Sequence, residues 1–570
     1  MLKLYRGLKK YTGQLVLLVL LLLGQVFSLL MLPNMMSSII DQGVVLGDIG
    51  YIARAGLVML AITLAGSACA IGVGYFASRI GVGFCTDVRK ELFHKVGQFT
   101  MAEFDQVGTA SLTTRTTNDI MQIQDFTIMM FRVIILAPIM CVGGIAMALQ
   151  KNMQLAMVII ACMPLIVAFL VIVMRKVFPI FRSVQSKLDH LNLIMRENVT
   201  GVRVIRAFTA EKREEERFAK ANAELTKTSV KSQVLLSTLM PLLMLIVNLG
   251  TIAVVWFGGQ QIAQGSLMVG DLMAFIQYLV LIMYALVMMS LIFAMMPRAS
   301  VCADRINEVM AITPNIKEST NPKAPKDRTG EVEFRDVTFR YGGAENPAVS
   351  NISFTAKPGC TTAIIGATGS GKSSIIMLIP RLYDVSEGAV LVDGVDVRDY
   401  DIHALRNRIG YVPQKAVLFS GTIRGNIAYE NEEMPITQVE KAAEIAQADS
   451  FIEEKQKGYD DPIAQGGTNV SGGQKQRLSI ARALAGDASI YIFDDSFSAL
   501  DFKTDASLRK ALKKNTKGAT VIIVAQRINT IMDADNILVV DEGRIIGQGT
   551  HQELIQSCEV YAEIARTQMS

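Results

Sequence analysis

Hydrophobic residues are concentrated in the first half of the chain, in runs long enough to cross a lipid bilayer. A membrane-spanning helix needs about 20 predominantly apolar residues. Six such runs lie at residues 14–36, 55–77, 133–149, 153–174, 236–262 and 272–296. The pattern therefore predicts an α-helical transmembrane domain with six spans.

The polar segments between these runs differ greatly in length. The links after the first, third and fifth runs are short, whereas residues 78–132 and 175–233 form long, charged segments rich in helix formers. Long segments without helix breakers are expected to continue the helices beyond the bilayer, by some tens of Å at about 1.5 Å per residue.

Basic residues predict the orientation of the spans. They flank the long loops more densely than the short ones: Arg79, Arg89, Lys90, Arg132, Arg175, Lys176, Arg182 and Lys231, against Arg54 and Lys151. Because cytoplasmic loops collect Lys and Arg near the span ends, both long loops and both termini are predicted to be cytoplasmic. The basic N-terminus precedes an apolar run that is too long for a signal peptide, so it is interpreted as a retained first span. These features predict a multi-pass protein of the plasma (inner) membrane.

The second half of the chain has the pattern of a soluble domain. Hydrophobic density falls and turn residues cluster at residues 312–330, as in a linker. From Glu331 onward, short β-rich runs alternate with helical ones, which is typical of an α/β domain with a largely parallel sheet. The predicted organisation is a transmembrane domain at 1–311, a linker at 312–330 and an α/β domain at 331–570.

Composition agrees with a membrane protein that has a large soluble part. Hydrophobic residues make up 51% of the 570 residues and the formal net charge is only +4. That charge gives no support to nucleic-acid binding. The seven cysteines stand singly, without a C-x-x-C pair. They are therefore expected to be buried thiols rather than a disulfide framework.

A phosphate-binding loop follows a predicted strand at residues 362–365 and precedes an apolar helical run at 375–379. It reads Gly366-Ala367-Thr368-Gly369-Ser370-Gly371-Lys372-Ser373-Ser374. In this G-x-x-x-x-G-K-[ST] pattern, glycines let backbone N–H groups surround phosphates, the lysine supplies positive charge and the first serine ligates magnesium. The strand-loop-helix setting makes an ordinary glycine turn improbable. The loop therefore predicts a site for ATP with Mg²⁺.

A second strand predicted at residues 490–494 carries an acid to its C-terminal edge. Asp494 is placed there to hold the magnesium ion through water. Between this strand and the phosphate loop lies the segment Asn469-Val470-Ser471-Gly472-Gly473-Gln474-Lys475-Gln476-Arg477. This segment resembles the signature of ATP-binding cassette (ABC) transporters, and a generic phosphate-loop enzyme has no use for it.

The resemblance extends over essentially the whole chain, which is similar to a type IV ABC exporter half-transporter of the multidrug-resistance-like kind. It implies that residues 331–570 form the ATP-binding cassette, that Tyr341 stacks on adenine and that Gln414 is the Q-loop glutamine, a further magnesium contact. It also places Asp501 in the D-loop segment Ser498-Ala499-Leu500-Asp501. Taken singly, Tyr341 also fits an ordinary strand residue and Gln414 a polar loop residue; their order and intervals favour the family roles.

In this family, the signature of one cassette completes the ATP site of the other. The resemblance therefore implies that Ser471, Gly472, Gly473 and Gln474 contact the ATP of a second half-transporter, with Ser471 acting in trans. It also implies two coupling helices at the tips of the long loops, expected at residues 104–119 and 207–218. A unit with two cassettes is thus required.

Three residues depart from the family pattern around one phosphate position. Asp495 stands where the pattern has glutamate, Ser496 replaces the following proline and Gln526 replaces the switch histidine. Asp is shorter than Glu by one methylene, and a misplacement near 1 Å can cost about 10²-fold in rate. Glutamine donates a hydrogen bond but cannot carry the charge available to imidazole. The chain is therefore interpreted as the degenerate-site subunit of a heterodimeric bacterial exporter, although a slow homodimer stays open.

The substrate is predicted from the spans, which contain few ionisable groups. The fifth and sixth spans are rich in methionine, whose adaptable side chain suits surfaces that accept many shapes: Met240, Met244, Met268, Met273, Met283, Met288, Met289, Met295 and Met296. This favours amphipathic or hydrophobic compounds such as drugs, lipids or peptides, although methionine also fills lipid-facing helices.

Three polar residues of the spans, Gln25, Asn34 and Asn248, are candidate cavity contacts that interhelical hydrogen bonds explain equally well. The expected mechanism is alternating access driven by ATP. An importer on the same scaffold and a non-transporting, ATP-gated regulator are the alternatives.

Overall fold

The computed structural model describes residues 2–323, 325 and 328–569, and the chain divides into two compact units. The first unit comprises Met1–Gly97 and Ala110–Ile312, and the second comprises Gln98–Thr109 and Thr313–Ser570. A short segment of the first long loop thus belongs with the C-terminal unit. Residues 324, 326 and 327 of the predicted linker lie outside the described part, and the boundaries at 311 and 330 stay predictions.

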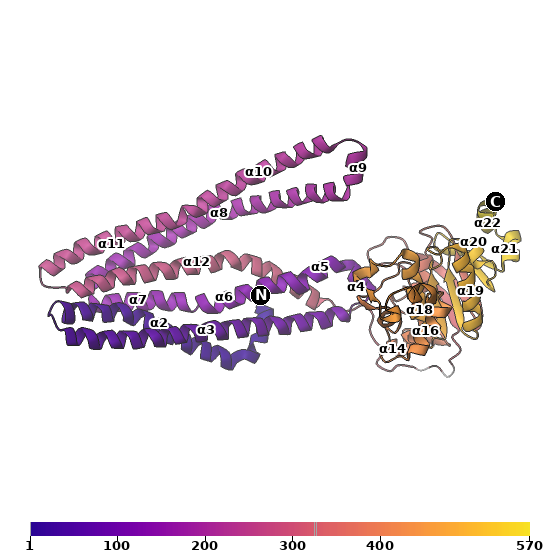
Figure 1. Cartoon of the computed structure of the whole chain (residues 1–570), viewed down its shortest axis with the longest axis horizontal. Coiled ribbons are helices and arrows are strands. Elements are labelled where there is room, and N and C mark those ends of the chain that lie inside the picture. The colour runs from indigo at the N-terminus through magenta and orange to yellow at the C-terminus, as the bar shows by residue number, and fades with distance from the viewer. Residues whose placement is uncertain (1, 324, 326–327, 570) are drawn as a thin grey trace. The chain divides into compact units, whose positions relative to one another are not determined.

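Six long apolar helical segments build the first unit within the described residues (Figure 1). Each is long and apolar enough to cross a membrane: Lys3–Val44, Ile49–Gly97, Thr109–Lys151, Met153–Thr200, Glu211–Ala263 and Val269–Ala311. Each contains one of the apolar runs found in the sequence. The predicted six-span transmembrane domain is therefore confirmed.

The helices of this part of the chain, including α9 between the fourth and fifth segments, are α1 (Leu2–Tyr5), η1 (Arg6–Tyr11), α2 (Thr12–Ser38), η2 (Ile39–Val44), α3 (Ile49–Gly97), α5 (Thr109–Thr114), η3 (Arg115–Asp119), α6 (Ile120–Val133), α7 (Leu136–Lys151), α8 (Met153–Thr200), α9 (Val202–Ala207), α10 (Glu211–Ser237), α11 (Leu239–Ala263) and α12 (Val269–Ala311). Helices α3 and α8 each run without interruption from an apolar span into a long polar loop. The predicted helical continuation of the loops is confirmed.

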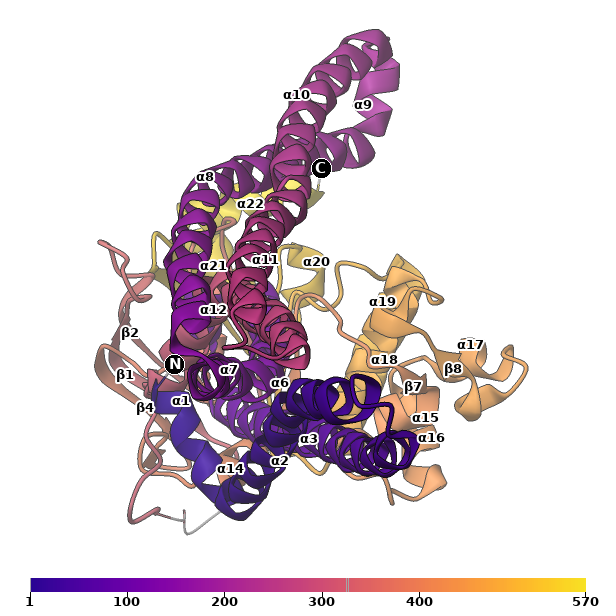
Figure 2. The same ribbon diagram turned by 90° about the vertical axis from the view of Figure 1, so that its left-hand side faces the viewer.

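Helices α8 and α10 form a long hairpin that α9 closes at its tip (Figures 1 and 2). Gly201 ends α8, with its N–H donating to Glu197 O at 2.8 Å. The prediction of this tip at residues 207–218 was wrong, because the charged helix formers from Glu211 onward already belong to α10. The other predicted tip, residues 104–119, overlaps the short helix α4 (Met101–Val107) of the second unit only at its start.

A polar cluster joins four helical elements of the first unit at the end opposite the α8–α10 hairpin tip (Figure 1). Lys151 Nζ lies 2.6 Å from Asp271 Oδ1, and Ser37 Oγ donates to the same carboxylate oxygen at 2.8 Å. Nearby, the backbone N–H of Gly270 donates to Asp41 Oδ1 at 2.7 Å. These contacts tie α12 to α7, α2 and η2.

The second unit contains a six-stranded sheet with strand order β12-β11-β3-β10-β9-β6. Its strands pair in parallel except for β12, which is antiparallel to β11. The predicted largely parallel sheet is thus confirmed. Two antiparallel sheets, β2-β1-β4-β5 and β7-β8, complete the strand set of the described residues and did not follow from the sequence pattern.

The strands are β1 (Val332–Phe339), β2 (Val349–Ala356), β3 (Thr361–Ile365), β4 (Glu387–Val392), β5 (Val395–Asp396), β6 (Ile409–Val412), β7 (Gly421–Thr422), β8 (Pro462–Ile463), β9 (Ile490–Asp494), β10 (Thr520–Val524), β11 (Asn536–Asp541) and β12 (Arg544–Gly549). The main helices around them are α13 (Lys372–Leu378), α15 (Ile423–Ile427), α16 (Ile436–Ile445), α18 (Gly472–Ala485), α19 (Phe502–Asn515), α20 (Ile528–Ile531), α21 (His551–Ser557) and α22 (Glu559–Met569).

The central sheet has a hydrophobic core on each face. Ala363 and Ile365 of β3 belong to one cluster, whereas Ile364 between them belongs to the other. Side chains of successive strand residues point to opposite faces, and a parallel sheet covered on both sides is built from continuous apolar runs. Burial of these strands fixes the sheet edge at which the polar site residues emerge.

Candidate nucleotide-binding site

The phosphate loop joins the end of β3 to the start of α13, as predicted from the sequence. Gly369 and Gly371 have φ angles of +86° and +99°, which side-chain-bearing residues rarely adopt. A Cβ atom on Gly366 would lie 2.0 Å from Val540 O. Glycine is therefore required at these places for the backbone to form the loop.

Lys372 lies inside the curve of this loop. Its Nζ donates to Gly366 O at 2.9 Å and to Ala367 O at 2.6 Å. The residue is only 8% exposed. Burial lowers the pKa of Lys372, while the nearby carboxylates of Asp495 and Asp494 oppose this shift. The loop thus surrounds a cation that two acids help to keep charged.

Ser373 and Asp494 meet beside the loop. Ser373 Oγ donates to Asp494 Oδ1 at 3.0 Å. The parallel register of β9 with β10 brings Asp494 to the carboxyl end of the sheet. Burial raises the pKa of Asp494, the hydrogen bond from Ser373 opposes this, and the charge of Asp495 adds to it. A hydroxyl and a carboxylate are the hard oxygen donors that Mg²⁺ takes alongside substrate phosphates, so the residues present fit Mg²⁺ with ATP.

Asp495 is brought together with two glutamines from different loops. Gln526 Nε2 donates to Asp495 Oδ2 at 2.8 Å, and Gln414 Nε2 donates to the same oxygen at 3.3 Å. Asp495 itself has a φ of +45° and is buried. The resemblance placed Asp495 and Gln526 at one phosphate position and Gln414 among the magnesium contacts, and in the structure both glutamine side chains meet the Asp495 carboxylate.

The serine that follows Asp495 is fully buried. Ser496 Oγ donates to Val412 O at 3.3 Å and to Asp494 O at 3.2 Å. A proline at this position has no hydroxyl to donate. Ser496 therefore links the end of β9 to the end of β6, the strand that leads to the Gln414 loop.

Tyr341 lies beside the helix that follows the phosphate loop. Its hydroxyl and Ser374 Oγ are 3.0 Å apart. Its ring meets those of Phe339 and Tyr383 edge-on, at centroid distances of 4.7 and 5.3 Å. The side chain is partly buried, which leaves part of the aromatic surface accessible.

The signature segment begins α18. Ser471 caps the helix in a reciprocal box with Gln474: Gln474 N–H donates to Ser471 Oγ at 3.3 Å, and Ser471 N–H donates to Gln474 Oε1 at 3.0 Å. Ser471 and Gly472 are exposed, whereas Gly473 is partly buried. Asp501 likewise caps α19, accepting from Thr504 N–H at 3.0 Å, and is exposed. These exposed groups are free to contact another chain.

Two sets of contacts near the site were missed by the sequence analysis. Gln568 of α22 donates from Nε2 to Gln526 O at 2.8 Å and accepts from Ile528 N–H at 2.8 Å. On helix α4, Asp105 Oδ2 accepts a 2.7 Å hydrogen bond from the Tyr383 hydroxyl. No local pattern signals either contact, because the partners are far apart in the sequence.

Comparisons with known proteins place this architecture in a family. An uncharacterised ABC transporter ATP-binding protein of Mycobacterium tuberculosis is 42% identical over 565 residues, which cover 98% of this chain and 97% of that protein. The chain belongs to the ABC transporter family. The family model for the ABC transporter transmembrane region matches residues 15–286, and the model described as ABC transporter matches residues 349–498.

Other relatives of this ABC transporter have a similar length. The uncharacterised ABC transporter ATP-binding protein YfiB of Bacillus subtilis is 39% identical, covering 98% of this chain and 97% of that protein. The ATP-dependent lipid A-core flippase of Aromatoleum aromaticum is 34% identical, covering 86% and 81%. The solved structure of a bacterial Atm1-family ABC exporter with ATP bound covers 99% of both chains, with a TM-score of 0.79 and 26% identity.

The chain is thus an ABC exporter half-transporter, with one membrane domain and one ATPase domain of the Atm1-like type IV kind. Half-transporters of this family dimerise, so the functional unit contains two such chains. The ATPase domain implies ATP binding.

Proposed function

We propose that this chain is the degenerate-site subunit of a heterodimeric exporter, in which a second half-transporter carries the catalytic glutamate and the switch histidine. The observation that carries the proposal is the environment of Asp495. Its side chain is one methylene shorter than that of glutamate, and two glutamine amides donate to the same carboxylate oxygen. A general base has to reach its water within hydrogen-bond distance. The short side chain and the two amide donors both hinder Asp495 from reaching and deprotonating a water molecule.

ATP binding at the same site is expected to be intact. Gly366 to Gly371 supply N–H groups, Lys372 supplies positive charge, and Ser373, Asp494 and Gln414 are proposed as the magnesium contacts. Bound Mg²⁺ would neutralise charge on the phosphates. Tyr341 is proposed to stack on adenine, where its position beside Ser374 supports this role.

The exposed signature supports the proposed catalysis in trans. Ser471, Gly472, Gly473 and Gln474 begin a capped helix whose first residues point to solvent. We propose that they complete the ATP site of the partner subunit together with Asp501. The productive hydrolysis then takes place at the partner's phosphate loop, and the signature of this chain is essential to it.

The complex is proposed to lie in the plasma (inner) membrane with both termini and the cassette in the cytoplasm. It moves amphipathic or hydrophobic compounds outward by alternating access.

The long loops are proposed to couple the cassettes to the membrane domain. Helix α4 contacts its own cassette through the Tyr383–Asp105 hydrogen bond. Helix α9 exposes Val204 (61% exposed) and is followed by Phe208 (79% exposed). We propose that this tip docks on the cassette of the partner, with these two apolar side chains in the contact.

The test is ATPase activity of the purified chain in lipid vesicles, alone and with its partner. Alone, it is expected to turn over slowly, and Asp495→Glu with Gln526→His is expected to raise the rate by about 10²-fold. The matched variant Asp495→Asn should change little in the complex, whereas Ser471→Ala should abolish the activity of the complex.

Two outcomes would contradict the proposal. Brisk hydrolysis by the chain alone that Asp495→Asn abolishes identifies a homodimeric exporter. ATP-dependent closure without stoichiometric movement of any substrate into vesicles identifies a non-transporting regulator. Comparing uptake with ATP and with a non-hydrolysable analogue separates the regulator from the exporter.

A further inference from the structure

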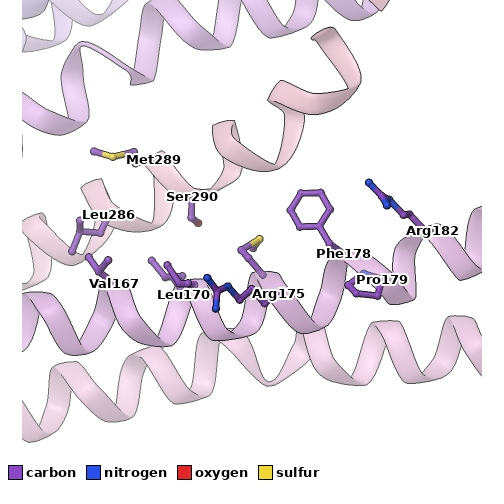
Figure 3. Close-up of a pocket in the computed structure, with 11 residues that line it drawn as sticks. Val167, Leu170, Arg175, Phe178, Pro179, Arg182, Leu286, Met289 and Ser290 are labelled. Atoms are coloured by element: carbon purple, nitrogen blue, oxygen red, sulfur yellow. The ribbon is translucent and has the colours of Figure 1, made fainter. Parts of the chain in front are cut away.

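A cavity of about 740 Å³ opens between helices α8 and α12 of the first unit. Its volume lies within the range of sites for drug-sized ligands, about 300–1,000 Å³. Figure 3 shows that one wall is a single face of α8 and the other is the segment of α12 around Met289. Every lining residue belongs to the membrane unit, so the cavity does not depend on the cassette.

The lining changes character along α8. Val167, Leu170 and Val171 form an apolar half, with Leu286 facing them from α12. Beyond Met174 the same wall carries Arg175, Phe178 and Arg182. These three residues recur at i, i+3 and i+7, so they lie on one face of the helix. At about 1.5 Å per residue, the two arginines are roughly 10 Å apart along it.

Within the described part of the chain, no carboxylate forms an ion pair with either guanidinium group. Among the described residues, neither Arg175 nor Arg182 forms an ion pair or a hydrogen bond, and none of the residues that line the cavity is acidic. A second cavity of the same unit is different, because Asp125 and Arg132 both line it. The α8–α12 cavity therefore carries a positive charge of about two units, from the two arginines, on a largely apolar surface.

The change of lining coincides with the end of the membrane-spanning stretch. The apolar run of the fourth span covers residues 153–174, and Arg175 is the first charged residue after it. A run of that length matches the thickness of the bilayer core, about 30 Å. By this estimate the apolar half of the cavity lies at the depth of the acyl chains and Arg175 at that of the head groups, with Arg182 roughly 10 Å further along α8. Arginine also matches carboxylate, sulfate and phosphate groups with paired N–H donors.

We propose that the α8–α12 cavity is a substrate site selective for amphipathic organic anions, with the tail between α8 and α12 and the anionic head at Arg175 and Arg182. This inference rests on the proposed export function, since it names the chemical class of the cargo. Positive charge at a span end also serves membrane orientation. If the two arginines only orient the span, ligand affinity should not depend on the charge of the ligand. Comparing the affinities of ligands that differ only in charge therefore distinguishes the two roles.

The experiment measures equilibrium binding, without ATP, to the full-length protein in phosphatidylcholine nanodiscs. The probes are a dansylated undecanoate and, with the same tail, its neutral methyl ester and a trimethylammonium analogue. The anion is expected to bind at least about tenfold more tightly than the ester. Arg175→Gln with Arg182→Gln should remove this preference without changing ester binding, and Arg175→Lys with Arg182→Lys should retain most of it.

The control is Lys176→Gln, which removes a neighbouring charge from a residue that does not line the cavity. It should leave anion binding unchanged. Equal affinities for the three probes, or a loss on Lys176→Gln as large as that of the double arginine variant, would overturn the proposal.

A second arm identifies the source of the anion. Adding phosphatidylglycerol to the nanodiscs is expected to displace the probe if the ligand is an anionic lipid. It should have no such effect if the ligand is a dissolved amphiphile. Either result is consistent with an amphipathic anion as the ligand. ATP-driven uptake into vesicles is measured separately. Selective binding of the anion without its uptake would contradict the proposed export function but support the anion site. Uptake of only neutral or cationic probes would contradict the anion site but support export.

Discussion

Gln526 Nε2 donates a 2.8 Å hydrogen bond to Asp495 Oδ2, and this contact restrains the carboxylate that follows the strand-end acid Asp494. Gln414 donates to the same oxygen from 3.3 Å. The backbone of Gln526 is in turn held by Gln568, which lies on the C-terminal helix. An oxygen that accepts from two amides is less available to accept a proton from water.

Removing the amide of Gln526 should destabilise the cassette. Gln526→Leu leaves a buried carboxylate with one donor fewer, which costs about 1–3 kcal/mol. For a domain of this size, each kcal/mol lowers the melting temperature by roughly 2–4 °C. Differential scanning fluorimetry of the full-length protein measures the shift, with the exposed Gln456→Leu as control. Equal melting temperatures for the wild type and Gln526→Leu would show that the hydrogen bond contributes nothing.

Tyr383→Phe should uncouple ATP hydrolysis from transport. The substitution removes only the hydroxyl that donates to Asp105 of α4 at 2.7 Å. Because hydrogen bonds to a charged group contribute about 1.5–3 kcal/mol, the attachment of α4 to the cassette weakens. We expect the number of substrate molecules moved per ATP to fall while ATPase activity persists.

The control for this coupling measurement is Tyr459→Phe, which removes the hydroxyl of a partly buried tyrosine packed against the cassette core. A parallel loss of ATPase and transport in Tyr383→Phe would instead indicate a folding defect.

Binding of ATP with Mg²⁺ should weaken at both ends of the pH range. Burial raises the pKa of Asp494 and lowers that of Lys372. Asp494 must be ionised to hold magnesium, so affinity falls in acid at a higher pH than for an exposed aspartate, whose pKa is about 3.9. Lys372 must be protonated, so affinity falls in base below the pKa of an exposed lysine, about 10.4.

The same shift in Asp494 has a defined sign for stability. Its folded-state pKa lies above its unfolded value, so its stabilising contribution is present at low pH and is lost as the pH rises through the folded-state pKa.

Titration with a fluorescent ATP analogue at a series of pH values measures the loss of binding in acid (the acid limb) and in base. Asp494→Asn should flatten the acid limb, and an unchanged acid limb in this variant would assign it to another group.

The ion pair between Lys151 and Asp271 should matter more for stability than a surface pair. Their side chains are 21% and 19% exposed. Removing one partner of a buried pair costs up to about 3–5 kcal/mol, so Lys151→Met and Asp271→Asn should each lower the melting temperature in nanodiscs. The double variant should recover part of the loss, since it leaves no unpaired charge.

The matched control is the exposed pair Lys10–Asp87, with side chains 67% and 40% exposed. Exposed pairs contribute about 0–1 kcal/mol, so Lys10→Met is expected to have little effect. Equal losses in both pairs would show that burial does not govern the contribution.

The membrane spans and the phosphate loop could be predicted because their signals are local. An apolar run of bilayer length and the glycine spacing from Gly366 to Gly371 are visible without knowing what packs against them. The tip of the α8–α10 hairpin was misplaced because Gly201 is a weak stop signal beside the charged residues that follow, which suit both a loop and a helix.

By itself, the sequence determined the six spans, the strand-loop-helix around Lys372 and the presence of Asp495 and Gln526, since each depends on neighbouring residues or on identity alone. Only the tertiary structure decided that Gln414 and Gln526 share one oxygen of Asp495, that Tyr383 holds α4, and that Arg175 and Arg182 line a cavity with α12. These relations join residues distant in the chain, and their geometry is set by sheet register and helix packing, which no local pattern encodes.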